Sequence, residues 1–231
     1  MAGLCWMAVM LAVFLSAENS LAVMDQNRLA AIVHGILREY RTRGMFSLAI
    51  RIPDNQNQNL KQILQQVFGS DPGNNVKNTI NSGEVYIGNR VVAAKVLQRP
   101  TGGAEHAESR VVDHLDHLFN SRNANDHDWL LFYVYASPCV EKCSSNRHRE
   151  SILQRLNHIR QWDNYAVVFS TIFIPRTGQP NTDRQRSAAL QRIGSSVGLD
   201  NIFRCARQDH RMQCTSCSVG GQVAPYCVSN S

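Results

Sequence analysis

The sequence predicts an α/β protein, a three-layer α/β/α sandwich built on a mixed five-stranded sheet. Two apolar runs carry this prediction, Trp129–Tyr135 and Tyr165–Ile174. Strands that are buried on both faces are nearly continuous in aliphatic and aromatic residues, as these runs are. The neighbouring segments place apolar residues at helical spacing. Strands that alternate with amphipathic helices are typical of a sheet covered by helices on both faces.

The other elements follow from periodicity and from turn residues. Gly44 ends the first amphipathic helix, and Thr182 or Asp183 can cap the last one. The Asn- and Gln-rich segment 54–81 holds a short helical pattern at Leu60–Phe68, and we interpret it as a surface insertion. The expected helices cover residues 25–43, 104–119, 139–162 and 183–197, and the expected strands 46–52, 85–97 (with a turn or bulge at Gly88-Asn89), 129–135, 165–174 and 201–204.

The N-terminus has the pattern of a signal peptide. Gly3–Leu15 is almost wholly apolar but too short to cross a bilayer, and Ser20-Leu21-Ala22 fits cleavage after Ala22. An N-terminal core helix or a signal anchor is the alternative. We therefore expect a signal peptide at 1–22, one domain at 23–207 and a cysteine-rich tail at 208–231. The mature protein is expected to be secreted and to have no membrane span, since no other long apolar stretch occurs.

Charge and length limit the class of protein only broadly. The formal net charge is +6, and loss of Glu18 with the signal peptide raises it to about +7. About 209 residues then remain of 231, enough for one domain with a sizeable core. The basic balance permits an acidic partner such as a polynucleotide or an anionic surface, and does not require one. No internal repeat occurs, which excludes a repeat protein.

Six cysteines remain after removal of the signal peptide, and four of them lie in the tail or just before it. An even number in an oxidising compartment predicts disulfides. Four cysteines allow three pairings, and the sequence does not choose between them. A zinc site made of Cys205, His210, Cys214 and Cys217 is the alternative. The disulfide candidates are Cys205, Cys214, Cys217 and Cys227.

A two-part motif carries the chemistry. His106-Ala107-Glu108 begins an expected helix, and Pro138-Cys139 and Cys143 follow a buried strand about thirty residues later. One imidazole and two thiolates make a zinc site that keeps its fourth position open for water. A carboxylate that is not a ligand can then move protons. Two cysteines four residues apart on a helix face the same side, so both could bind one ion.

This motif resembles the signature of the zinc deaminase superfamily, His-x-Glu followed by Pro-Cys-x-x-Cys. The aromatic strand before Ser137-Pro138-Cys139 resembles the AID/APOBEC-like branch. Within that branch, the signal peptide and the tail are similar to the secreted novel AID/APOBEC-like deaminases of vertebrates. The resemblance implies that His106, Cys139 and Cys143 bind Zn²⁺ and that Glu108 is the general acid and base. Three residues separate the cysteines here instead of two, which leaves a Cys139–Cys143 disulfide as an alternative.

The resemblance also implies a substrate groove. It would be bordered by Tyr135, Ala136 and Ser137 at the strand end and by Arg176 in the next loop. Polynucleotide editors of this branch carry Trp just before Ser-Pro-Cys, where this chain has Ala136. An aromatic wall for a flipped base would therefore have to come from elsewhere.

Three functions are compatible with these observations. The first is a secreted zinc-dependent deaminase that hydrolyses cytosine in a nucleoside or a single-stranded polynucleotide, with defence as one setting. The second is a catalytically inactive deaminase-fold protein that binds nucleic acid or another extracellular ligand. The third is a secreted structural or defence module held by three disulfides. The sequence leaves open DNA or RNA, cytosine or adenine, and the oligomeric state.

Overall fold

The computed structural model describes residues 25–55, 57–123, 126–175 and 178–229, so the expected signal peptide lies outside the described residues. Within these ranges, seven strands form one mixed sheet in the order β2-β3-β1-β6-β7-β8-β9. The pairs β6–β7 and β7–β8 are parallel, and the other neighbours are antiparallel. The predicted α/β fold on a mixed sheet is confirmed.

The sheet contains the five expected strands and two further edge strands. The 85–97 segment forms a hairpin whose turn includes Gly88-Asn89, which adds β2, and the tail adds β9. The expected domain boundary at residue 207 lies within β8, so part of the tail continues the sheet. The strands are β1 (Phe46–Pro53), β2 (Tyr86–Ile87), β3 (Val91–Lys95), β6 (Asp128–Ala136), β7 (Tyr165–Thr171), β8 (Ile202–Gln208) and β9 (Arg211–Ser216). Two small separate hairpins are β4 (Leu97–Gln98) with β5 (Ala104–Glu105), and β10 (Ser218–Val219) with β11 (Gln222–Val223).

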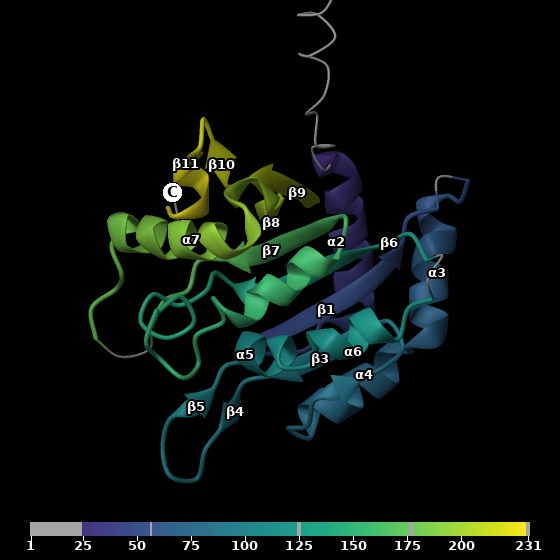
Figure 1. The fold of residues 1–231 in the computed structure, drawn as a ribbon, viewed down its shortest axis with the longest axis horizontal. Helices are drawn as coiled ribbons and strands as arrows, with labels where there is room; N and C mark the ends of the chain where they lie inside the picture. Colours follow the sequence, from purple (N-terminus) through teal and green to yellow (C-terminus); the bar gives the residue numbers. More distant parts are fainter. Residues whose placement is uncertain (1–24, 56, 124–125, 176–177, 230–231) are drawn as a thin grey trace, which may run out of the picture.

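Helices cover both faces of the sheet (Figure 1). Because successive strand residues point to opposite faces, Phe132 joins one core and Leu131 and Tyr133 the other. One face packs against α2 (Gln26–Tyr40), α3 (Leu60–Ser70) and α4 (Gly73–Asn81), and the other against α5 (Ala107–Val112), α6 (Leu115–Asn120), the 3₁₀ helix η1 (Arg155–Gln161) and α7 (Asp183–Val197). Short 3₁₀ turns are η2 (Leu199–Asn201) and η3 (Pro225–Cys227). None of the helices in the described ranges is both long and apolar enough to cross a membrane.

The Asn- and Gln-rich segment is not a surface insertion. It forms α3 and α4, which pack on the sheet. Their sparse apolar residues fall at helical spacing and are buried in the core under α2: Ile63, Leu64, Val67, Val76 and Ile80. A few well-spaced apolar side chains suffice for a helix that buries only one stripe.

The single helix expected over 104–119 is two short helices. Residues Ala104–Glu105 are strand β5, and His114 interrupts the helix with φ −121° and ψ 13°. Arg155 on the neighbouring η1 pairs with the Asp113 carboxylate and also donates to the carbonyl of Ser109 at 3.0 Å. In a continuous helix the Ser109 carbonyl would accept the N–H of Asp113, so this arginine competes with continuation of the helix.

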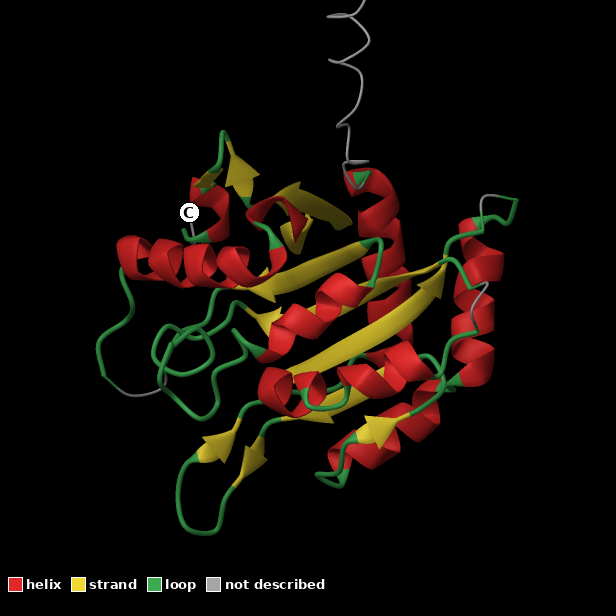
Figure 2. Ribbon diagram, viewed as in Figure 1, coloured by secondary structure: helices red, strands yellow, loops and turns green. Residues whose placement is uncertain are grey.

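The helix expected over 139–162 is also absent. Cys139–Cys143 forms one turn, irregular chain follows, and only Arg155–Gln161 is helical, as 3₁₀ helix (Figure 2). Side chains take the carbonyl groups that an α-helix would use. Arg192 donates to the carbonyl of Ser144, and the Ser144 hydroxyl donates to the carbonyl of Cys139 at 3.0 Å. Side-chain to backbone hydrogen bonds of this kind compete with helix formation.

Cys205 and the three cysteines of the tail form two disulfides, Cys205–Cys214 and Cys217–Cys227. The first joins directly paired residues of β8 and β9, and the second encloses the β10–β11 hairpin. This pairing selects one of the three possibilities and rules out the alternative zinc site in the tail.

Candidate metal centre

The two parts of the motif meet at one end of the sheet. His106 precedes α5 as its N-cap residue, and Glu108 lies in the first turn of that helix. Cys139 follows the end of β6, after Ser137 and Pro138. The structure therefore brings together residues that are more than thirty positions apart, as predicted.

Three ligand atoms cluster tightly. His106 Nδ1 lies 3.0 Å from Cys143 Sγ and 3.7 Å from Cys139 Sγ, and the two sulfur atoms are 3.2 Å apart. Both thiols are free, and their separation is well beyond the roughly 2.05 Å of a disulfide. The geometry thus gives no support to the Cys139–Cys143 disulfide or to the module with three disulfides.

The extra residue between the cysteines is accommodated by the turn itself. The backbone N–H of Cys143 donates to Cys139 Sγ at 3.2 Å, and the N–H of Ser144 donates to the Cys139 carbonyl at 3.2 Å. The chain thereby folds back over four to five residues, and both sulfur atoms face His106. The two thiols are therefore oriented by this turn and not by the first turn of the helix that was expected over residues 139–162.

Glu108 is buried beside these atoms, with 4 % of its surface exposed. Its Oε1 lies 2.8 Å from Cys143 Sγ and 3.7 Å from His106 Nδ1. A carboxylate at this position is close enough to exchange protons with a molecule bound at the cluster.

The cluster perturbs the pKa values of its members when no metal is bound. Hydrogen bonds to Cys139 and Glu108 raise the pKa of His106 to about 10. The hydrogen bond with Cys143 lowers the pKa of Cys139 to about 5, while burial raises the pKa of Cys143. Burial acts to raise the pKa of Glu108, but hydrogen bonds to His106 and Cys143 outweigh it and lower that pKa. Glu108 is therefore ionised at neutral pH.

The donor set fits zinc. Zn–S and Zn–N bonds of about 2.3 and 2.0 Å place tetrahedral ligands roughly 3.5–3.8 Å apart. Two of the observed separations, 3.0 and 3.2 Å, are shorter than that range and the third, 3.7 Å, lies within it, so small side-chain movements would admit the ion. One nitrogen and two sulfur atoms within 4.8 Å of one another are a group that could hold a metal.

Two cavities adjoin the cluster. One, of about 280 Å³, is lined by His106, Cys139, Lys142 and Phe173. The other, of about 330 Å³, is lined by Glu108, with His106 and Phe173 again. Both the candidate ligand and the candidate acid/base therefore border space that a small molecule could enter.

The predicted substrate residues are not all at this site. Tyr135 packs on Phe46 with ring centroids 5.9 Å apart, in the core on the opposite face of the sheet. Ala136 is buried, and the Ser137 hydroxyl accepts the Phe173 N–H at 3.0 Å, which holds the chain after β7. Arg176 lies outside the described residues.

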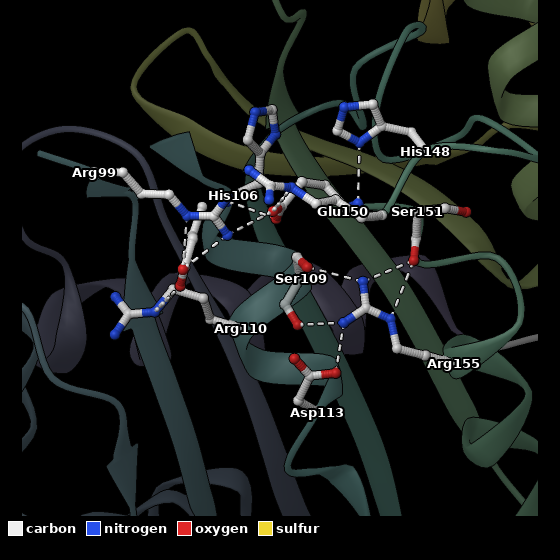
Figure 3. Close-up of polar contacts among 11 residues, drawn as sticks. Arg99, His106, Ser109, Arg110, Asp113, His148, Glu150, Ser151 and Arg155 are labelled. Atoms are coloured by element: carbon white, nitrogen blue, oxygen red, sulfur yellow. Dashed lines mark hydrogen bonds and ion pairs between the residues drawn. The ribbon is translucent and has the colours of Figure 1, made fainter. Parts of the chain in front are cut away.

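Phe173 and Glu150 are the residues that the sequence analysis missed. Phe173 supplies an aromatic wall to both cavities, and its place after a buried strand was the available signal. Glu150 accepts the backbone N–H of His106 at 3.3 Å and pairs with Arg99 Nη2 at 3.2 Å (Figure 3). Arg99 also pairs with Glu105, next to His106, so this ion pair braces the start of α5.

A mixed sheet that places a His-x-Glu helix start beside two cysteine thiols is consistent with a deaminase-like α/β fold. The model of the family described as Secreted Novel AID/APOBEC-like Deaminase 1 matches residues 26–230, and the chain belongs to this family. The resemblance inferred from the motif is thereby confirmed. No curated protein and no solved structure matches the chain.

Proposed function

We propose that the mature chain is a secreted zinc-dependent deaminase that hydrolyses the exocyclic amino group of cytosine. One observation carries the proposal. A buried Glu108 lies beside three zinc-type ligand atoms where two cavities adjoin. The family description supports deaminase chemistry and secretion, and two disulfides are typical of an extracellular protein.

His106, Cys139 and Cys143 would hold the ion. Zinc in such a site supplies Lewis acidity, which makes water nucleophilic near neutral pH. Glu108 would take a proton from the attacking water and deliver it to the departing nitrogen. Water and cytosine thereby yield uracil and ammonia, and Glu108 returns to its ionised state.

The substrate would enter along Phe173. Its ring borders both cavities and could stack on a pyrimidine, in the role for which Ala136 is too small. A cavity of about 280 Å³ that adjoins a second one of about 330 Å³ is in the range for a nucleoside-sized ligand. We propose cytosine in a nucleoside or a single-stranded polynucleotide as the substrate.

A second function is favoured by the position of Tyr135. It faces away from the cluster, and the Ser137 hydroxyl is engaged by Phe173, so the strand end offers little to a substrate. A catalytically inactive deaminase-fold protein that binds nucleic acid or another extracellular ligand would have this arrangement.

A deamination assay separates the two functions. The zinc-loaded mature protein is given cytidine, deoxycytidine and single-stranded DNA and RNA oligonucleotides in parallel. Glu108→Gln should keep its zinc and lose about 100-fold or more in turnover, since a general acid/base contributes that much. Glu141→Gln is the control, because this exposed residue lines the neighbouring cavity beside His106 and Cys139 and is not one of the clustered residues. Equal turnover in Glu108→Gln would refute the role, and an inactive zinc-loaded wild type would favour the binding protein.

A further inference from the structure

A third cavity, of about 410 Å³, lies on the sheet face opposite the metal centre. It opens between the C-terminal part of α2 and the ends of β6, β7 and β8. Its polar lining includes His34, Arg38, Arg41, Tyr133, Ser170 and Arg207. Tyr133 belongs to the core under α2, which places this cavity away from His106 and Cys139. Carboxyl ends of parallel strands are a common place for ligands.

The cavity carries positive charge without compensation. None of its lining residues in the described chain is Asp or Glu. The guanidinium groups of Arg38, Arg41 and Arg207 are at exposed positions and have no hydrogen-bond or ion-pair partner among the described residues, so all three are available to an anion. The C-terminal end of a helix favours cations, which accounts for Arg38 and Arg41. It does not account for Arg207, which comes from β8.

The floor of the cavity offers a hydroxyl donor. Tyr133 Oη lies 2.9 Å from Ser170 Oγ, and 1 % of Tyr133 is exposed. Two hydroxyl groups that share one hydrogen bond leave one proton free to donate to a ligand. Burial raises the pKa of Tyr133 to about 12, although the hydrogen bond with Ser170 and, less strongly, the charge of Arg41 oppose the shift, so the hydroxyl stays protonated.

We propose that this cavity binds a phosphate monoester. The phosphate would lie between the guanidinium groups of Arg38, Arg41 and Arg207, which match its oxygen atoms in charge and geometry. The organic part of the ester would pack on Tyr135 and Met212, which line the same cavity. This site is separate from the deaminase centre and requires neither zinc nor turnover.

Calorimetric titration of the full mature chain with phenyl phosphate and with inorganic phosphate tests the proposal. Phenyl phosphate should bind more tightly, because its ring gains the apolar wall. Arg38→Gln and Arg41→Gln should each weaken binding about tenfold, the effect of losing one charged hydrogen bond. Arg184→Gln is the control, since Arg184 is exposed on α7 and also lacks a partner among the described residues. These substitutions are at exposed positions, so the fold should be preserved.

Oligonucleotides with and without a 5′-phosphate distinguish the source of the ester. Tighter binding of the phosphorylated strand, lost in Arg38→Gln, identifies the end of a polynucleotide as the ligand. Equal binding of both strands, together with Arg38-dependent phenyl phosphate binding, identifies a free small phosphate. The proposal is overturned if phenyl phosphate fails to bind at about 10 mM. It is also overturned if Arg184→Gln weakens the binding of phenyl phosphate as much as Arg38→Gln does. The same holds if Lys142→Gln, in the metal cavity, weakens that binding while Arg38→Gln and Arg41→Gln leave it unchanged.

Discussion

At the scale of single residues, the contacts that hold the backbone of His106 matter to the metal centre as well as the three candidate ligands. Glu150 accepts the His106 backbone N–H and pairs with Arg99, and its carboxylate is only 6 % exposed. Groups that orient a metal ligand from behind tune the affinity of the site almost as strongly as the ligands. By fixing the backbone of His106, Glu150 helps to set the position of the Nδ1 atom at the cluster.

Replacing Glu150 should lower zinc affinity. Glu150→Ala removes both the acceptor for the His106 N–H and the partner of Arg99, and should weaken zinc binding about 10- to 100-fold. Glu150→Gln keeps an acceptor oxygen and should lose less. Competition with a chelating dye measures both, with Glu141→Gln as the control. Unchanged zinc affinity in Glu150→Ala would show that Glu150 has only a general structural role.

The ligand cluster could be predicted from the sequence, but Glu150 could not. His106, Glu108, Cys139 and Cys143 have the residue types and the order that suit zinc chemistry, although the cysteines are one residue further apart than in the signature. Glu150 is a lone acidic residue that follows Arg147, His148 and Arg149, and only the irregular chain after Cys143 brings it to His106. Tyr135, in contrast, was expected to border the substrate groove. The alternation of side chains along β6 directs it to the sheet face opposite the metal centre.

At the scale of elements, Asp71 joins the α3–α4 junction to the β2–β3 turn. Its buried carboxylate accepts the Tyr86 hydroxyl at 2.9 Å and the N–H groups of Asn89 and Arg90 at 3.0 and 2.8 Å. Its backbone carbonyl accepts the Tyr40 hydroxyl at 2.8 Å. These contacts fasten a segment that looked like a surface insertion to the edge of the sheet.

Stability should fall at alkaline pH through Tyr86. Burial and the hydrogen bond to Asp71 raise the pKa of Tyr86 from 10.0 to about 12, so the fold favours its neutral form. The contribution is complete below pH 10 and is lost as the pH rises towards 12. Urea unfolding between pH 8 and about 11 should show the free energy of unfolding decline more steeply in the wild type than in Tyr86→Phe. Parallel declines would contradict this assignment.

Strands were predicted better than helices for a physical reason. The buried runs of β6 and β7 are apolar whatever packs on them. The ends of helices were decided by tertiary contacts, such as Arg192 on the Ser144 carbonyl and Arg155 on the Ser109 carbonyl. No local pattern reveals which arginine will reach a given carbonyl.

At the scale of the whole molecule, the tail is part of the folded domain. Cys217 and Cys227 are fully buried in the core that also contains Cys139 and Cys143. Arg204 donates to the carbonyls of Tyr226 and Ser229, which holds the C-terminal segment on β8.

Removal of the Cys217–Cys227 disulfide should therefore destabilise the domain as a whole. Replacing both cysteines with Ser should lower the free energy of unfolding by about 2–4 kcal/mol, the usual effect of a native disulfide. Urea unfolding monitored by tryptophan fluorescence measures it. An unchanged free energy of unfolding would mean that the tail is independent of the domain.

The metal centre is the central claim, and zinc K-edge X-ray absorption of the mature protein tests it most directly. The structure predicts about one zinc per chain, with two sulfur ligands near 2.3 Å and nitrogen or oxygen ligands near 2.0 Å. Absence of zinc, or a first shell without two sulfur atoms, would contradict the site formed by His106, Cys139 and Cys143.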